Sequence, residues 1–90
     1  MNLSDWRRRI DELDRKLVEL LNERSRCAIE IGRLKRDLHL GIFDADRERQ
    51  VVRNIQRANN GPLDNEGLQR LFERIIDECR RSERIESQKE

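Results

Sequence analysis

Apolar residues recur every three or four positions from Leu3 to Leu38, and this spacing predicts one long amphipathic helix. We call this stripe the seam; its positions are Leu3, Trp6, Ile10, Leu13, Leu17, Leu20, Arg24, Cys27, Ile31, Leu34 and Leu38. Gly32 lies within the pattern, where it costs about 1 kcal/mol relative to alanine without ending the helix. We place this helix at residues 4–38, with Ser4 or Asp5 as its N-cap and Gly41 as the residue that breaks it.

Two shorter helices are predicted after it. Residues 45–58 carry Val51, Val52 and Ile55 on one face, and Asp44 precedes them as an N-cap. The run Asn59-Asn60-Gly61-Pro62 then predicts a turn. A third helix at residues 65–86 follows Asp64, again an N-cap, and its apolar stripe consists of Leu68, Leu71, Phe72, Ile75, Ile76 and Cys79.

The composition indicates that this all-α chain does not fold alone. Its 90 residues are enough for a single domain over residues 1–90. Because only 34% of them are hydrophobic and 43% are charged, the core of this domain is small. A helix about 54 Å long cannot cover its seam with so few apolar partners. We therefore expect an oligomer whose chains share one core, and a polar tail from Ser87 that frays.

Charge and cysteine content exclude several classes of protein. With 20 basic and 19 acidic residues and 3% aromatics, the chain is a poor candidate for binding nucleic acid. It has neither an apolar run of about 18 residues nor a signal-like start, so we expect no membrane span and no secretion. Cys27 and Cys79 lack metal-ligand spacing and fall on apolar stripes, which predicts buried, reduced thiols in a cytoplasmic protein without a metal.

A second stripe beside the seam carries cations at its two ends. It consists of Arg7, Asp14, Leu21, Ala28 and Lys35 at heptad spacing. Arg7 and Lys35 are about 42 Å apart in one helix, too far to hold one small ligand. If two copies pair antiparallel about Leu21, however, Arg7 of one chain lies beside Lys35 of the other. Such a dimer would have two equivalent cationic sites, each built across the chains.

Ionisable groups also occupy apolar positions in all three predicted helices. They are Arg24 on the seam, Arg47 and Glu48 in the second helix, and Glu83 one turn beyond Cys79. Because an unpaired buried charge is costly, such groups pair with one another or with a ligand. One alternative is a structural network, for instance Arg24 with Glu83 or Arg47 with Glu48. Counting Arg7 and Lys35, cations exceed acids in this set, which favours a ligand with several carboxylates or phosphates.

These residues and their order resemble the all-helical chorismate mutases. The similar segments are Arg7 with Ile10, Asp11 and Asp14, then Leu20-Leu21-Asn22-Glu23-Arg24, Ile31-Gly32-Arg33-Leu34-Lys35, Ile42-Phe43-Asp44-Ala45-Asp46-Arg47-Glu48-Arg49 and Leu71-Phe72-Glu73-Arg74-Ile75-Ile76. Together they cover about Leu3 to Glu83. The resemblance implies three helices per chain in an intertwined homodimeric bundle, with two active sites that are each completed by an arginine of the partner chain.

The resemblance also implies which residues bind the two carboxylates of chorismate. Arg7 of one chain would act with Arg24 and Lys35 of the other, and Arg47 would support this anion site. Cys79 stands where some relatives have a serine that bonds a substrate carboxylate, although a thiol is a weaker donor.

Three further positions would face the ring and the bond that breaks. Asp44, through its backbone, and Glu48 would hold the ring hydroxyl. Lys35 would also reach the ether oxygen, and Glu83 matches the position that donates a hydrogen bond to this oxygen. Some relatives have glutamine there, so Glu83 has to be protonated to act as a donor.

The expected function is conversion of chorismate to prephenate in aromatic amino-acid biosynthesis. This [3,3] rearrangement is unimolecular and needs no nucleophile, metal or cofactor. One alternative is a lyase of the same fold that removes pyruvate from isochorismate, and the intact run Asp44–Arg49 favours the mutase over it. The other alternative is a non-catalytic helical dimerisation module, which gives no reason for charges on apolar stripes.

Overall fold

The computed structural model describes residues 1–41 and 43–89 and contains three helices in these ranges. They are α1 (Leu3–Asp37), α2 (Ala45–Ala58) and α3 (Asn65–Lys89). Neither described range contains a strand, so the predicted all-α fold is confirmed. Ile42, which the sequence places in the connection before α2, lies outside the described residues.

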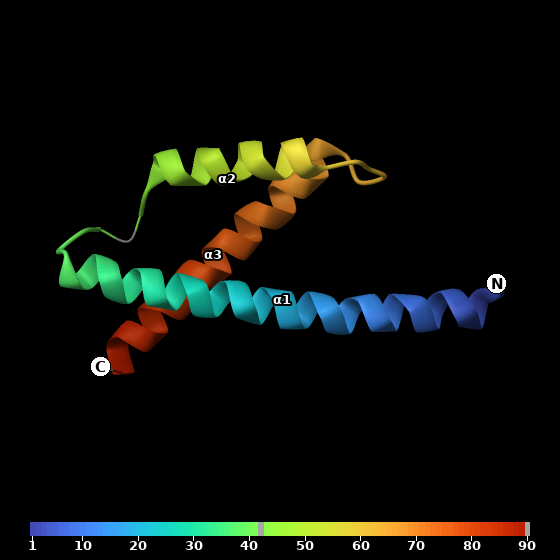
Figure 1. The fold of residues 1–90 in the computed structure, drawn as a ribbon, viewed down its shortest axis with the longest axis horizontal. Helices are drawn as coiled ribbons and strands as arrows, with labels where there is room; N and C mark the ends of the chain where they lie inside the picture. Colours follow the sequence, from blue (N-terminus) through green and yellow to red (C-terminus); the bar gives the residue numbers. More distant parts are fainter. Residues whose placement is uncertain (42, 90) are drawn as a thin grey trace.

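The helix α3 joins the other two. It crosses α1 at a steep angle and packs against α2 near its own N-terminal end (Figure 1). Within the described ranges α1 and α2 pack against α3 and not against each other. The N-terminal half of α1 extends beyond both of the other helices (Figure 1). None of the described helices is long and apolar enough to cross a membrane.

The first helix begins at Leu3, one residue earlier than predicted. Asn2, and not Ser4 or Asp5, is the N-cap residue: its side chain accepts a 2.9 Å hydrogen bond from the backbone N–H of Asp5. The Asp5 carboxylate in turn accepts one of 3.1 Å from the backbone N–H of Asn2. This reciprocal capping box satisfies two amide donors, so the prediction was wrong about the cap residue but right that Asp5 takes part.

At its other end α1 stops at Asp37, one residue earlier than predicted, and the residue that turns the chain is His39 rather than Gly41. His39 has a φ of 57°. Its N–H donates to the carbonyl of Arg36 at 3.0 Å, and the N–H of Leu40 donates to that of Lys35 at 2.7 Å. These two bonds form a Schellman motif with His39 in the left-handed position that glycine normally occupies.

Because a side chain in this conformation is strained, we expect His39→Gly to stabilise the protein by about 0.5–1 kcal/mol. The measurement is the free energy of unfolding in urea at fixed chain concentration. Gly41→Ala is the matched control, since no other group lies within 4 Å of the added Cβ. A His39→Gly variant that is less stable than the wild type would show that the imidazole makes a contact worth more than the strain.

The caps of the other two helices are as predicted. Asp44 accepts a 3.1 Å hydrogen bond from the N–H of Arg47, and Asp64 accepts one of 2.6 Å from the N–H of Gly67. The helix α3 continues to Lys89, whose amine lies 3.2 Å from the carboxylate of Glu86. The helix therefore extends three residues beyond the predicted end at Glu86, through the tail that was expected to fray from Ser87, and this pair adds an i,i+3 contact in its last turn.

Small residues mark the crossing of α1 and α3. Gly32 is the buried residue of α1, and Cys79, 6% exposed, is that of α3. A Cβ added at Gly32 would lie 3.1 Å from the Oε2 atom of Glu83 and 3.3 Å from its Cγ. The absence of a side chain at Gly32 thus leaves the space that Glu83 occupies.

The seam of α1 is largely uncovered in a single chain. Its large apolar residues from Leu3 to Leu38 are between 41% and 66% exposed. The radius of gyration is 16.1 Å, whereas a compact domain of this length would have one of about 12 Å. The molecule is therefore extended, and its most regular apolar surface faces outward.

Candidate active site

A cavity of about 240 Å³ lies where the three helices converge. We call it the central pocket. It is lined by Arg24, Cys27, Ala28, Ile31 and Lys35 of α1, by Asp44, Arg47, Glu48 and Val51 at the start of α2, and by Ile76, Cys79, Arg80 and Glu83 of α3. Apolar side chains form part of its wall and charged groups converge on it from all three helices. This combination is typical of a site for a small, charged ligand.

Seven of the eight predicted site residues line this pocket. They are Arg24, Lys35, Asp44, Arg47, Glu48, Cys79 and Glu83. Arg7 is the exception: it is exposed on the N-terminal half of α1, about 42 Å along the helix from Lys35. One chain therefore assembles all of the predicted set except the residue that was expected to come from a second copy.

The pocket carries an excess of uncompensated positive charge. The Asp44 carboxylate caps α2, and the Glu48 carboxylate forms an ion pair with Arg80. Arg24 is half-buried and forms no ion pair within the described ranges. The guanidinium of Arg47 donates a 2.7 Å hydrogen bond to the side-chain carbonyl of Gln50, which leaves its charge unneutralised. Neither of the two pairs given as examples of a structural network, Arg24 with Glu83 or Arg47 with Glu48, occurs among the described residues, although Glu48 does pair within the protein, with Arg80.

Glu83 is a carboxyl group in an environment that favours its neutral form. Burial raises its pKa above the ordinary value, because desolvation penalises the carboxylate. Four cations oppose this shift: Lys35 and Arg36 from α1, and Arg80 and Arg84 from α3. Desolvation is the largest contribution, so a proton is retained at Glu83 to higher pH than at an exposed glutamate.

The two cysteines differ in their surroundings. Both are free thiols, and Cys79 is buried at the α1–α3 crossing as predicted. Cys27 is exposed in the single chain, so the expectation that both thiols are buried is wrong at this level of structure. The reason is its place on the seam, whose large apolar residues are exposed as well.

Two residues of this region were missed by the sequence analysis. Arg80 lines the pocket and binds Glu48, and Gly32 provides the space for Glu83. Arg80 lies one turn after Ile76, so the i,i+4 rule that singled out Glu83 beyond Cys79 applies to it equally. A glycine within an otherwise regular helix often marks a close approach, which is the signal that Gly32 offered.

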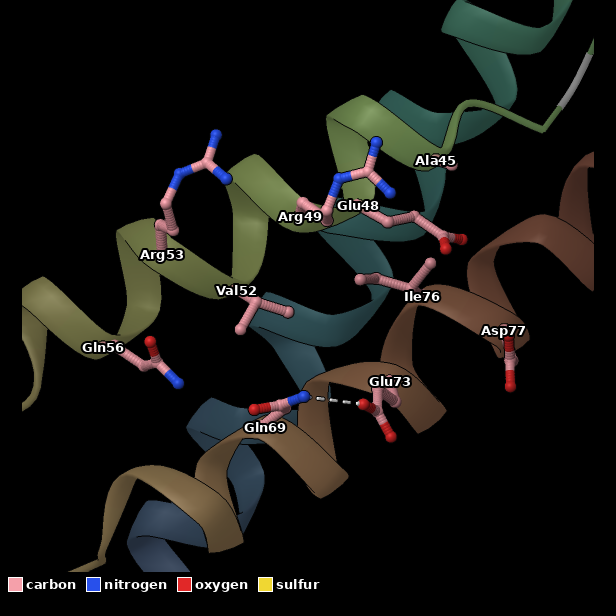
Figure 2. Close-up of a pocket in the computed structure, with 10 residues that line it drawn as sticks. All are labelled: Ala45, Glu48, Arg49, Val52, Arg53, Gln56, Gln69, Glu73, Ile76 and Asp77. Atoms are coloured by element: carbon pink, nitrogen blue, oxygen red, sulfur yellow. Dashed lines mark hydrogen bonds between the residues drawn. The ribbon is translucent and has the colours of Figure 1, made fainter.

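A larger and shallower groove, of about 620 Å³, lies between α2 and α3. Figure 2 shows Arg49 and Arg53 on its α2 side and Glu73 and Asp77 on its α3 side. Of the predicted site residues only Glu48 borders it. The charges of its two walls are of opposite sign, so it lacks the cationic excess of the central pocket. The predicted site residues therefore gather at the smaller cavity and not in this groove.

Comparison with known proteins shows which family shares this sequence and architecture. The family model described as chorismate mutase type II matches residues 6–84. The bifunctional chorismate mutase/prephenate dehydratase of Pseudomonas aeruginosa is 45% identical over 83 residues, covering 86% of this chain and 22% of the relative. That of Escherichia coli (strain K12) is 40% identical over 73 residues, covering 80% of this chain and 19% of the relative. The chain thus spans about a fifth of the length of the curated relatives it matches.

A solved structure has the same fold over most of its length. The chorismate mutase of Thermus thermophilus (form II) superposes with a TM-score of 0.84 at 32% identity, covering 86% of this chain and 88% of that one. Fold and pocket define an all-helical protein of the chorismate mutase kind. The chain belongs to the chorismate mutase type II family, which confirms the resemblance seen in the sequence.

Proposed function

We propose that this chain converts chorismate to prephenate, and that the central pocket is where it does so. The observation that carries the proposal is the convergence of seven predicted site residues on one cavity with excess positive charge. Chorismate is a dicarboxylate, so a pocket in which Arg24 and Arg47 form no ion pair among the described residues suits its charge. The family membership and the similar structure named a chorismate mutase support the same reaction.

In this proposal the cations hold the substrate in its reactive shape. Arg24 and Lys35 of one chain and Arg7 of a second copy bind the two carboxylates, and Arg47 adds positive charge beside them. Holding both carboxylates at once favours the compact conformer in which the two ends of the molecule can bond. Restricting a flexible reactant in this way removes much of the entropic barrier of a unimolecular step.

The remaining groups act where charge develops. As the ether bond breaks, its oxygen becomes partly negative, and the Lys35 amine with a protonated Glu83 stabilises it by hydrogen bonds. Donors that are fixed in advance lower the barrier because they need not reorganise during the reaction. Asp44, through its backbone, and Glu48 bind the ring hydroxyl, and Cys79 packs against the bound substrate as a weak donor to a carboxylate.

A homodimer accounts for both the exposed seam and the place of Arg7. The chain exposes 7388 Å², whereas a compact monomer of its mass would expose about 5,600 Å². The excess for two chains, about 3,600 Å², is within the range buried by obligate homodimers. Antiparallel pairing of α1 about Leu21 covers the seam and brings Arg7 to the Lys35 of the other copy.

The location that we propose is the cytoplasm. Cys27 and Cys79 are both free thiols, and reducing compartments keep cysteines in this state.

The pH dependence of the reaction should report the proton on Glu83. Because only the neutral carboxyl can donate to the ether oxygen, kcat/KM should be highest below the raised pKa of Glu83 and fall as pH rises through it. Glu83→Gln, which donates at every pH, should abolish this fall. The measurement is kcat/KM of both proteins from about pH 4 to 9.

Stability provides an independent check of the same shift. Since the folded-state pKa of Glu83 is raised, its contribution to stability is complete at low pH and is lost as pH rises through that pKa. Glu83→Gln should therefore match the wild type at low pH and be the more stable protein at neutral pH. In the kinetic experiment, if kcat/KM of the wild type and of Glu83→Gln were both independent of pH, Glu83 would have no part in the mechanism.

The direct test is to follow chorismate by its ultraviolet absorbance and to identify the product. We expect rapid loss of chorismate with prephenate as the sole product, and no release of pyruvate from isochorismate. A folded dimer that consumes neither compound would overturn the proposal and leave a helical dimerisation module. Pyruvate and salicylate from isochorismate, without prephenate from chorismate, would assign the pocket to a lyase.

A further inference from the structure

Arg80, which lines the central pocket, links α3 to α2 and to the connection before α2. From α3 it forms an ion pair with Glu48 of α2, and its Cζ lies 5.1 Å above the centroid of the Phe43 ring in the connection before α2. A second carboxylate, that of Asp77 one turn earlier, lies 3.6 Å away. The side chain of Arg80 is only 22% exposed. It is therefore held in one place by contacts on three sides.

The Glu48 carboxylate has a choice of partners in this pocket. Figure 2 shows its side chain reaching from α2 toward α3, where Arg80 binds it. The same cavity holds Arg24, Lys35 and Arg47. A carboxylate released from Arg80 would be drawn to one of these cations, because charge attraction is strong in a half-buried site. It would then compete with the carboxylates of a bound substrate.

We propose that Arg80 is a positioning residue of this site: it fixes the Glu48 carboxylate on the α2 wall and keeps it away from the cations that bind substrate. This inference rests on the proposed function. Through Phe43 the same guanidinium also holds the start of α2 against α3, since a cation over an aromatic face is attracted to it. Arg80 thus acts through Glu48 and the connection and not by contact with the reacting atoms.

The surroundings of Glu83 provide a readout that a purely structural role would not change. Arg80 is one of the cations that lower the pKa of Glu83, together with Lys35, Arg36 and Arg84, while burial raises it. Removing the charge at Arg80 should therefore raise the pKa of Glu83 further. The fall of kcat/KM with pH should then begin at a higher pH than in the wild type.

The first comparison is between neighbouring arginines of α3. Arg80→Leu should raise KM about tenfold with a smaller change in kcat, because the displaced Glu48 occupies the anion site. Arg81→Leu is the matched control: Arg81 is exposed and its nearest acid is Glu78, 3.7 Å away and outside the pocket. It should leave KM and the pH profile unchanged. Arg80→Lys, which keeps the charge, should recover most of the affinity, and it provides a second test should the leucine variant fail to fold.

The decisive measurement is the same substitution in a Glu48→Gln background. If Arg80 acts through Glu48, Arg80→Leu should change KM by less than about twofold there, since no carboxylate remains to be displaced. If the wild type is active but Arg80→Leu raises KM equally with and without Glu48→Gln, the proposed role of Arg80 is overturned and the proposed function is not. Equal effects of Arg80→Leu and Arg81→Leu would have the same consequence. A folded wild type without mutase activity would instead overturn the proposed function, and the role of Arg80 with it.

Discussion

Arg24→Leu should reduce kcat/KM for chorismate by about 10²–10³-fold and, in the same protein, raise the free energy of unfolding by about 1–2 kcal/mol. The loss of activity follows because Arg24 is a half-buried cation without an ion pair in the described part of the chain, so its charge is available to a substrate carboxylate. The gain in stability follows because leucine continues the apolar seam of α1. Chorismate kinetics and urea denaturation of the purified variant measure the two effects.

Arg26→Leu is the matched control for this pair of effects. Arg26 is an exposed residue two positions further along α1 and does not line the pocket. Its replacement should leave kcat/KM within about twofold of the wild type and change stability by less than about 0.5 kcal/mol. If Arg24→Leu stabilised the protein and left the kinetics intact, the cation would have no part in binding substrate.

Mixing two inactive variants should restore activity if each site is built from two chains. Arg7→Ala and Lys35→Ala should each lower kcat by at least about a hundredfold. In a heterodimer of the two, one site lacks both residues, whereas the other contains Arg7 from one chain and Lys35 from the other. Unfolding the variants together and refolding them at equal concentration should therefore recover about a quarter of wild-type activity.

A second mixture tests whether the recovery depends on the geometry of the dimer. Arg24→Ala and Lys35→Ala alter the same side of a site, so every dimer formed from them has a defect in both sites. This mixture should stay inactive under the same refolding protocol. Recovery in both mixtures, or in neither, would contradict the assignment of Arg7 to the opposite chain.

Regular features of this chain could be predicted from the sequence because their causes are local. The caps Asp44 and Asp64 and the bounds of α2 follow from side chains that bond to amides three residues away. Helical periodicity identified the charges that lie on apolar stripes and so favoured an anionic ligand, but it was the resemblance to the chorismate mutases that implied a shared site for Arg24, Lys35 and Glu83. All three line the central pocket.

Features that depend on contacts between helices were not predictable in this way. The partner of Glu48 is Arg80, 32 positions away, and which of the pocket's cations it would meet depends on how α2 lies on α3. From the sequence, Gly32 only lowers the stability of α1. The structure shows that its lack of a side chain lets Glu83 lie against α1. His39 in the left-handed conformation was missed because nearby Gly41 is the residue that sequence rules select.

In the dimer proposed above, the uncovered seam of α1 would make the stability of this protein depend on its concentration. Dilution would dissociate the dimer and expose the seam to water, and dissociation would remove both the shared core and the opposite-chain half of each site. The unfolding midpoint and the specific activity are in that case functions of concentration rather than constants of the chain. By the same logic, any polypeptide joined to this helical unit would be brought together in pairs.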